Sequence, residues 1–168
     1  MESSGLMSAS KSLLQHVSSI WAKSMAVKGM DTTLIPRLQV IGATPGKVEC
    51  QLRVEESHLN RLETLHGGVI AALVDVGGSL ACTTKGYDIT GVSTDINVSY
   101  LSSAKLGDVL CMTAKCEKFG RTLAFTNIEL RVKDRLVAQG RHTKYVGMAT
   151  HVFSEENLSI PKAKEDTP

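Results

Sequence analysis

The residues best suited to chemistry lie in one segment, where the triplet His-Gly-Gly at residues 66–68 precedes a run of apolar and small residues. Within residues 69–81 the exceptions are Asp75 and Ser79, which are four positions apart and would share one face of a helix. A carboxylate on an otherwise apolar core helix is costly unless it has partners or a task. The free N–H groups at the start of that helix can bind an anion or a polarised carbonyl oxygen. Together these features indicate an acyl-transfer site.

The spacing of this segment limits how such a site can be built. Gly67 and Asp75 are eight residues apart, so about 12 Å of helical rise separates them. A carbonyl group bound by the Gly67 N–H cannot also lie within about 3.5 Å of Asp75 in the same chain. Either the two residues have unrelated roles, or the site combines residues of two chains. The second possibility predicts a dimer with its active site at the interface.

Composition indicates one globular domain and argues against several classes of protein. The chain has 168 residues, of which 42% are hydrophobic and 21% charged, and its net charge of +2 is too small to argue for nucleic acid or a membrane surface. Its four cysteines form no C-x-x-C pair and no zinc-like Cys/His spacing, so we expect reduced thiols and no metal. No apolar run is long enough for a membrane span. Residues 1–30 lack the long apolar region of a secretory signal, so we expect a cytoplasmic or mitochondrial protein rather than a secreted one.

Alternation of apolar and polar residues predicts the elements that would position the helix. Residues 47–55 alternate cleanly, which indicates a strand with one buried face. Further strands are predicted at residues 35–41, 92–101, 109–118, 122–132 and 136–145. A moderately amphipathic pattern over residues 8–26 predicts an additional N-terminal helix.

The short connections between the last four strands favour antiparallel neighbours. We therefore predict an α+β fold in which an antiparallel sheet of about six strands wraps around one central helix. Gly77 and Gly78 inside that helix indicate either close packing or room for a pocket. The predicted organisation is an N-terminal helix and lead-in at residues 1–34, the main domain at 35–147 and a flexible tail at 148–168.

Several motifs, in this order and spacing, carry a resemblance to a known family. They are Asn60…Thr64-Leu65-His66-Gly67-Gly68…Leu73-Val74-Asp75, Gly91-Val92-Ser93-Thr94-Asp95-Ile96-Asn97-Val98-Ser99-Tyr100, Gly120-Arg121-Thr122-Leu123-Ala124-Phe125 and Ala138-Gln139-Gly140-Arg141-His142-Thr143-Lys144. Residues 35–147 resemble the hotdog-fold acyl-CoA thioesterases, in the branch that contains thioesterase superfamily member 2 and the bacterial phenylacetyl-CoA thioesterases. The resemblance implies a hotdog fold and hydrolysis of a fatty or aryl acyl-CoA to the free acid and CoA. It implies no cofactor beyond the CoA that the substrate carries.

The resemblance also implies roles for individual residues. Asp75 would activate water or attack the thioester, and the Gly67 N–H would polarise the thioester carbonyl. Asn60 and His66 would shape and orient that site, and Ser93 would lie near the nucleophile. The expected assembly is at least a homodimer and, beyond it, a homotetramer built as a dimer of dimers.

Segments rich in polar and cationic residues would hold the nucleotide end of CoA. By resemblance they comprise Tyr100, Leu101, Ser102, Ser103, Ala104, Lys105, Lys118, Phe119, Gly120, Arg121, Thr122, Leu123 and Tyr145. Lys105, Lys118 and Arg121 would supply the positive charge that the CoA phosphates need.

Plainer interpretations of the same residues stay open at this point. Asp75 could be a structural carboxylate paired with a lysine, and His66 could be only the N-cap of the helix or, instead, the main base. Asn60 could be a turn residue. Lys118 and Arg121 could form a solvated hairpin end.

Two other functions compete with the thioesterase. Hotdog hydroxyacyl dehydratases pair a histidine with a helix carboxylate, and a non-catalytic acyl-CoA-binding protein would leave Asp75 idle. The combination of Asn60, the His-Gly-Gly triplet and Asp75 favours the thioesterase.

Overall fold

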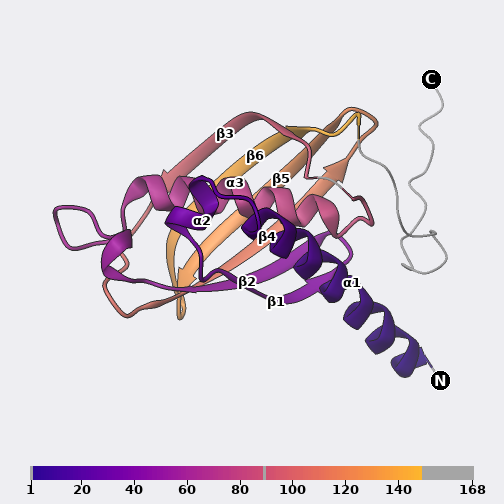
Figure 1. Ribbon diagram of the computed structural model, residues 1–168, viewed down its shortest axis with the longest axis horizontal. Helices are drawn as coiled ribbons and strands as arrows, with labels where there is room; N and C mark the ends of the chain where they lie inside the picture. The colour runs from indigo at the N-terminus through magenta and orange to yellow at the C-terminus, as the bar shows by residue number, and fades with distance from the viewer. Residues whose placement is uncertain (1, 89, 149–168) are drawn as a thin grey trace.

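The computed structural model describes residues 2–88 and 90–148, with the side chains of residues 12–88 and 90–148 (Figure 1). Its helices are α1 (Glu2–Met25), α2 (Met30–Leu34) and α3 (Gly67–Thr83), with a short 3-10 turn at Glu56–His58. Its strands are β1 (Gln39–Thr44), β2 (Lys47–Arg53), β3 (Val92–Tyr100), β4 (Val109–Phe119), β5 (Leu123–Val132) and β6 (Arg135–Tyr145). Over the described residues these six strands form one antiparallel sheet in the order β1-β2-β4-β5-β6-β3. The predicted α+β fold is confirmed.

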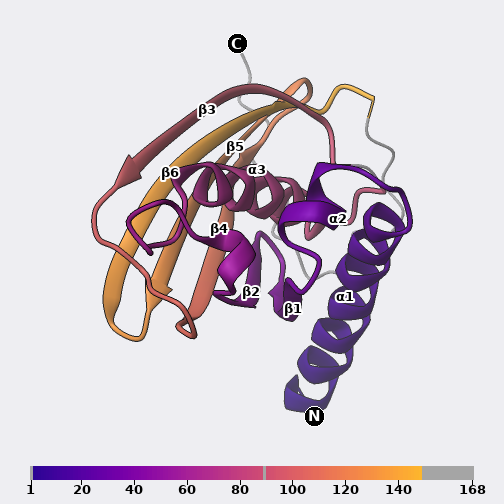
Figure 2. The same cartoon turned by 60° about the vertical axis from the view of Figure 1, so that its left-hand side comes forward.

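The sheet curves around α3, as Figure 2 shows. The two glycines of α3 are the points of closest approach: a Cβ at Gly77 would lie 2.7 Å from Met112 Sδ, and one at Gly78 would lie 2.6 Å from Thr126 Oγ1. Both distances are too short for a real side chain, so glycine here permits close helix–sheet packing. Of the two explanations that the sequence allowed for these glycines, close packing is the one that the structure supports.

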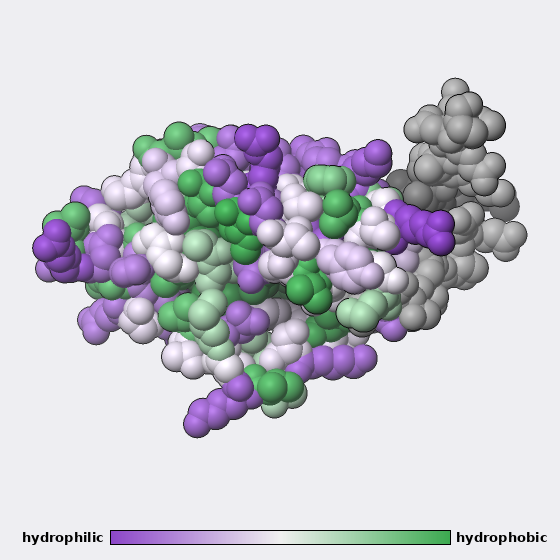
Figure 3. All heavy atoms as spheres, turned by 90° about the horizontal axis from the view of Figure 1, so that it is seen from above, coloured by the Kyte–Doolittle hydropathy of each residue, from purple (hydrophilic) through white to green (hydrophobic). Residues whose placement is uncertain are grey.

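The strand β3 is an edge of the sheet and pairs within the chain only with β6. Eight of its nine residues are exposed, and the exception, Val98, is half-buried. Apolar Ile96 and Val92 are among the exposed residues. Figure 3 views the molecule from the side that is uppermost in Figure 1, and there apolar and polar side chains are interspersed on the surface. An exposed edge strand offers unpaired N–H and C=O groups to a further strand.

One predicted strand was wrong in position. The strand expected at residues 35–41 begins only at Gln39, because Ile35 ends α2 and Pro36 follows it. Ile35 and Leu38 are nevertheless buried in the core. These two residues are apolar because the connecting segment packs on the core, and their spacing resembles the alternation of a strand.

The N-terminal helix α1 packs against the same core as the sheet. Leu13, Val17 and Trp21 are buried within that core, and the Trp21 Nε1–H donates a hydrogen bond to the Leu38 carbonyl, at 3.0 Å. The division of the chain at residue 34 stays a prediction, and the predicted tail lies outside the described residues except for Met148. No helix in the described part of the chain is long and apolar enough to cross a membrane.

Candidate active site

The carboxylate of Asp75 lies on the partly covered face of α3 and is 41% exposed. The Ser93 hydroxyl of β3 donates a hydrogen bond to Asp75 Oδ1, at 3.0 Å. The Ser79 hydroxyl donates to the Asp75 main-chain carbonyl, at 2.9 Å. The structure therefore joins Asp75, Ser79 and Ser93 in one cluster. It corrects the expectation of a buried carboxylate, because this face of α3 opens to solvent.

Two residues of β6 complete the surroundings of Asp75, and sequence reasoning missed both as functional residues. Lys144 Nζ lies 3.8 Å from Asp75 Oδ1 and donates a hydrogen bond to Ser79 Oγ, at 2.8 Å. His142 Nε2 lies 3.5 Å from Asp75 Oδ1 without the geometry of a hydrogen bond. The alternation along β6 could have identified them, because every second residue from Ala138 and Gly140 to His142 and Lys144 is buried on the same face of the strand.

Burial controls the charge of these two side chains. The pKa of His142 is lowered by burial and by the charge of Lys144, against a smaller opposing effect of Asp75, so its imidazole is neutral near pH 7. The pKa of Lys144 is also lowered by burial, although Asp75 and Cys82 oppose that effect. The plainer interpretation of Asp75 as a structural carboxylate required a lysine partner, and Lys144 is in a position to be that lysine.

A cleft of about 230 Å³ opens beside Asp75. It is lined by Trp21, Ser24, Asp31, Asp75, Val76, Ser79, Leu80, Thr90, Gly91, Ser93 and Lys144. The wall opposite α3 comes from α1 and α2. Burial and, to a smaller extent, the charge of Asp75 raise the pKa of the Asp31 carboxyl. The cleft therefore holds two carboxylates and one buried ammonium group.

The N-terminus of α3 forms a separate group of predicted residues. His66 is the N-cap of α3, and its Nδ1 accepts a hydrogen bond from the Gly68 N–H, at 2.8 Å. Among the residues that the structure describes, none accepts a hydrogen bond from the Gly67 N–H. Tyr100 Oη lies 3.3 Å from the Gly67 carbonyl, to which it donates a hydrogen bond. This end of α3 thus presents a free donor beside the last residue of β3.

Asn60 acts within its own loop. Its Oδ1 accepts hydrogen bonds from the Leu62 and Thr64 N–H groups, at 2.8 and 3.2 Å, and its Nδ2 donates to Thr64 Oγ1, at 2.9 Å. In the same loop Glu63 has a φ of 58°, which is unusual for a residue other than glycine. The observed contacts match the turn interpretation, and Asn60 makes no contact with Asp75.

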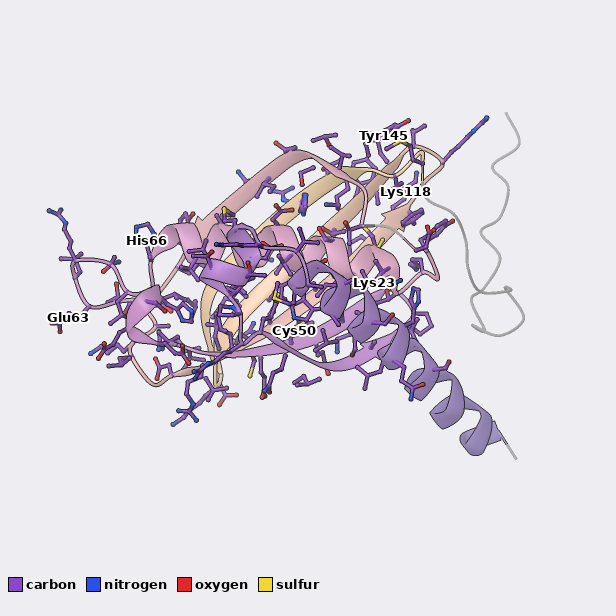
Figure 4. All side chains as sticks on the ribbon, in the orientation of Figure 1. Lys23, Cys50, Glu63, His66, Lys118 and Tyr145 are labelled. Carbon is purple, nitrogen blue, oxygen red and sulfur yellow. The ribbon has the colours of Figure 1, made fainter. Side chains whose placement is uncertain are left out.

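Within one chain, the cluster around Asp75 and the N-terminus of α3 lie apart. The register places Val92 of β3 opposite Tyr145, which pairs in turn with Leu123, whereas Tyr100 lies opposite Ala138 at the other end of the sheet. Figure 4 shows His66 at one end of the molecule and Lys118 and Tyr145 at the other. Asp75 and Ser93 belong to the second end, because the contact between them ties α3 to the start of β3.

The residues assigned by resemblance to the CoA site divide in the same way. One set lies at the Gly67 end and the other at the far end; in chain order they are Tyr100, Leu101, Ser102, Ser103, Ala104 and Lys105, then Lys118, Phe119, Gly120, Arg121, Thr122, Leu123 and Tyr145. Lys105, Lys118 and Arg121 are exposed, whereas Ala104 is fully buried. Ser102 and Ser103 are held by Arg135, which donates hydrogen bonds to the Ser102 hydroxyl and the Ser103 carbonyl.

Comparison with known proteins agrees with this architecture. Residues 62–139 match the Thioesterase superfamily. Human acyl-coenzyme A thioesterase 13 is 47% identical over 118 residues, which cover 68% of this chain and 83% of the human protein. The crystal structure of zebra fish thioesterase superfamily member 2 aligns with a TM-score of 0.72 and 43% identity, over 77% of this chain and 94% of that one. A hypothetical thioesterase from Streptococcus pneumoniae, solved with coenzyme A, aligns with a TM-score of 0.62 and 27% identity, over 70% and 92% of the two chains. The chain therefore has the hotdog fold and belongs to the thioesterase superfamily, in agreement with its predicted class of thioester hydrolase.

Proposed function

We propose that the protein is an acyl-CoA thioesterase, which hydrolyses a fatty or aryl acyl-CoA to the free acid and CoA. The observation that carries the proposal is the half-exposed Asp75 carboxylate, which Ser93 holds by one oxygen beside an open cleft. Among the described residues none bonds to its second oxygen, Oδ2, which is therefore available to a water molecule. Similarity to an acyl-coenzyme A thioesterase, and to a thioesterase solved with coenzyme A, supports this substrate class.

A second copy of the chain would complete the site. Two copies of the edge strand β3, paired antiparallel about a two-fold axis near Ile96, would place Ser93 of one copy beside Ser99 and Tyr100 of the other. Because Ser93 contacts Asp75 and Tyr100 contacts Gly67, this pairing brings Asp75 of one copy to Gly67 of the other. The same symmetry brings the two CoA-binding sets together. The exposed surface of β3 supports a homodimer as the smallest active unit.

In this dimer, Gly67 of one copy and Asp75 of the other would hydrolyse the thioester together. The Gly67 N–H donates to the thioester oxygen, where negative charge develops during attack. Asp75 takes a proton as the water oxygen bonds to the carbonyl carbon. The C–S bond breaks in the second step, and the proton held by Asp75 passes to the departing thiolate. No metal or other cofactor enters this scheme.

The packing of α3 favours one side of the helix for the acyl chain. Close contact of Gly77 with Met112, and of Gly78 with Thr126, leaves no room for a side chain at these two positions facing the sheet. The cleft on the opposite face of α3 is open, and α1 contributes Trp21 and Ser24 to its wall. We infer that the acyl group lies there.

The dehydratase alternative gains one observation, the closeness of His142 to Asp75. A dehydratase histidine must reach a substrate proton. The His142 side chain is fully buried and does not line the cleft, so it cannot do so without a rearrangement of β6. The geometry favours hydrolysis at Asp75.

A thiol-release assay over a panel of acyl-CoA chain lengths tests the proposal. Asp75→Asn keeps the size of the side chain and removes the base, so turnover should fall by about 100-fold or more while the protein stays folded. Asp134→Asn, the same change on an exposed residue of the turn between β5 and β6, is the matched control. Turnover of Asp75→Asn near the wild-type rate would contradict the assigned role, and release of water from a hydroxyacyl-CoA without thiol would favour the dehydratase.

A further inference from the structure

Lys144 is the feature of the site that the proposed reaction leaves unexplained. Its side chain is only 2% exposed, although the ammonium group of lysine is strongly hydrated in water. The ammonium lies 2.8 Å from Ser79 Oγ, 3.5 Å from Ser93 Oγ and 3.8 Å from Asp75 Oδ1. All its polar neighbours at these distances therefore belong to the cluster around Asp75. A charge buried at this cost indicates a task.

The direction of the hydrogen bonds defines that task. An ammonium group has three donors and no acceptor, so both serine hydroxyls must turn their lone pairs toward it. The hydroxyl hydrogens then have to point elsewhere. That of Ser79 points to the Asp75 main-chain carbonyl, and that of Ser93 points to Asp75 Oδ1. A neutral amine at position 144 could accept a hydrogen bond from either hydroxyl and so reverse it, and an apolar side chain would remove the donor that fixes the direction of both.

We propose that Lys144 is a positioning residue that orients the Ser79 and Ser93 hydroxyls and so holds the Asp75 carboxylate with Oδ2 turned to the cleft. The inference rests on the proposed hydrolysis at Asp75. It assigns Lys144 an indirect role, because the ammonium lies behind the serines and acts on water through Asp75.

Lys144 must be protonated for this role, so activity should fall when its proton is lost. Its pKa is lowered from 10.5 by burial, against the opposing charges of Asp75 and Cys82 on α3. The other titratable groups at the cluster are Asp31 of α2 and His142 of β6. The pKa of His142 lies below 6.5, so its imidazole has already lost its proton at alkaline pH, and the pKa of Asp31 is only raised from its ordinary acidic value. We therefore assign a decline of kcat below pH 10.5 to Lys144.

The experiment compares Lys144→Met and Lys144→Arg in the full chain. Methionine has a similar volume and no charge, so kcat should fall by about 10-fold to 100-fold at all pH values with KM unchanged. The Tm should stay the same or rise, because the cost of burying the ammonium disappears. Arginine keeps the charge and the donors, so it should recover part of the rate and remove the alkaline decline.

Two further measurements sharpen the comparison. Cys82→Ala removes the thiol that acts on the charge of Lys144 and should leave the alkaline decline in place. In a Ser93→Ala background, Lys144→Met should cost less than in the wild type, because both residues act through the same carboxylate.

The outcomes separate the inference from the function on which it rests. A wild-type kcat in Lys144→Met, or a loss of rate fully explained by a lower Tm, would overturn the positioning role while leaving the thioesterase intact. An alkaline decline that persists in Lys144→Arg would also overturn it. A wild-type protein that hydrolyses no acyl-CoA, or an active Asp75→Asn variant, would overturn both.

Discussion

At the scale of single residues, the site depends on a few polar groups whose neighbours decide what they can do. Asp75 is half-exposed and tied to Ser93, so it is available to water. His142 lies next to it but is fully buried and neutral. The two residues are close together, yet only Asp75 is exposed enough to take part in the proposed chemistry.

The buried His142 makes stability depend on pH. Its folded-state pKa lies below 6.5, so between the two values the unfolded chain binds more protons than the folded protein. The free energy of unfolding must therefore decrease as pH falls through 6.5. His142→Gln removes this titration. We expect wild-type Tm to fall between pH 7.5 and 5.5 by about 3 °C more than that of the variant. Equal slopes for the two proteins would show that His142 is protonated equally in both states.

The sequence predicted Asp75, Gly67 and Ser93 but not Lys144 or His142. Asp75 and Gly67 stand out because a carboxylate interrupts an apolar helix and glycines open it, whereas Ser93 was assigned by resemblance to the family. The last two lie in a strand whose alternation is readable, but which face of β6 meets α3 depends on sheet pairing. That pairing is long-range, between residues such as Ser93 and Lys144, and no local pattern encodes it.

At the scale of elements, helix α3 connects the two halves of the site and α1 forms the cleft wall. Five of the six strands, and helix α3, could be predicted from the alternation and the apolar run in the sequence. The misplaced first strand shows the limit of that reasoning, because Ile35 and Leu38 are buried without belonging to a strand. The spacing of apolar residues indicates which residues are buried. Whether they form a strand or a connecting segment depends on hydrogen bonding to a neighbouring strand.

The wall formed by α1 should determine which acyl chains fit. Ser24 lines the cleft, so Ser24→Phe should fill part of it. We expect kcat/KM for a long-chain acyl-CoA to fall by about 10-fold, with little change for a short-chain one. Ser19→Phe makes the same change on an exposed position of α1 and serves as the control. An equal effect of Ser24→Phe on both chain lengths would place the acyl group elsewhere.

The turn between β4 and β5 should bind the charged end of CoA. Lys118→Ala or Arg121→Ala removes an exposed cation, so KM for acyl-CoA should rise by about 3-fold to 10-fold while kcat changes little. Lys115→Ala removes an exposed cation from the same strand and should leave KM unchanged. If KM is unaffected by all three changes, the turn is a solvated hairpin end.

At the scale of the whole molecule, the fold places the two residue groups that the proposed site combines at opposite ends of the sheet. Gly67 lies beside Tyr100 at the end of β3, and Asp75 lies beside Ser93 near its beginning. The eight-residue spacing in the sequence predicted this separation. The proposed dimer would bring the two groups together, and both the dimer and the expected tetramer stay predictions.

The most direct test of the account asks whether Gly67 and Asp75 of different copies form one site. Gly67→Pro removes the N–H donor at the first helical position, where proline is tolerated. Gly67→Ala, which keeps the N–H but adds a Cβ 3.3 Å from the Tyr100 ring, controls for crowding. Gly67→Pro and Asp75→Asn should each be nearly inactive alone.

In a mixed dimer of these two variants, one site carries both defects and the other carries neither. Differently tagged chains, co-refolded and purified as mixed dimers, should recover up to about half of the wild-type rate of thiol release, if the two sites are independent. Mixed dimers that show no more activity than the separate variants would contradict the shared site and require Gly67 and Asp75 to act within one chain.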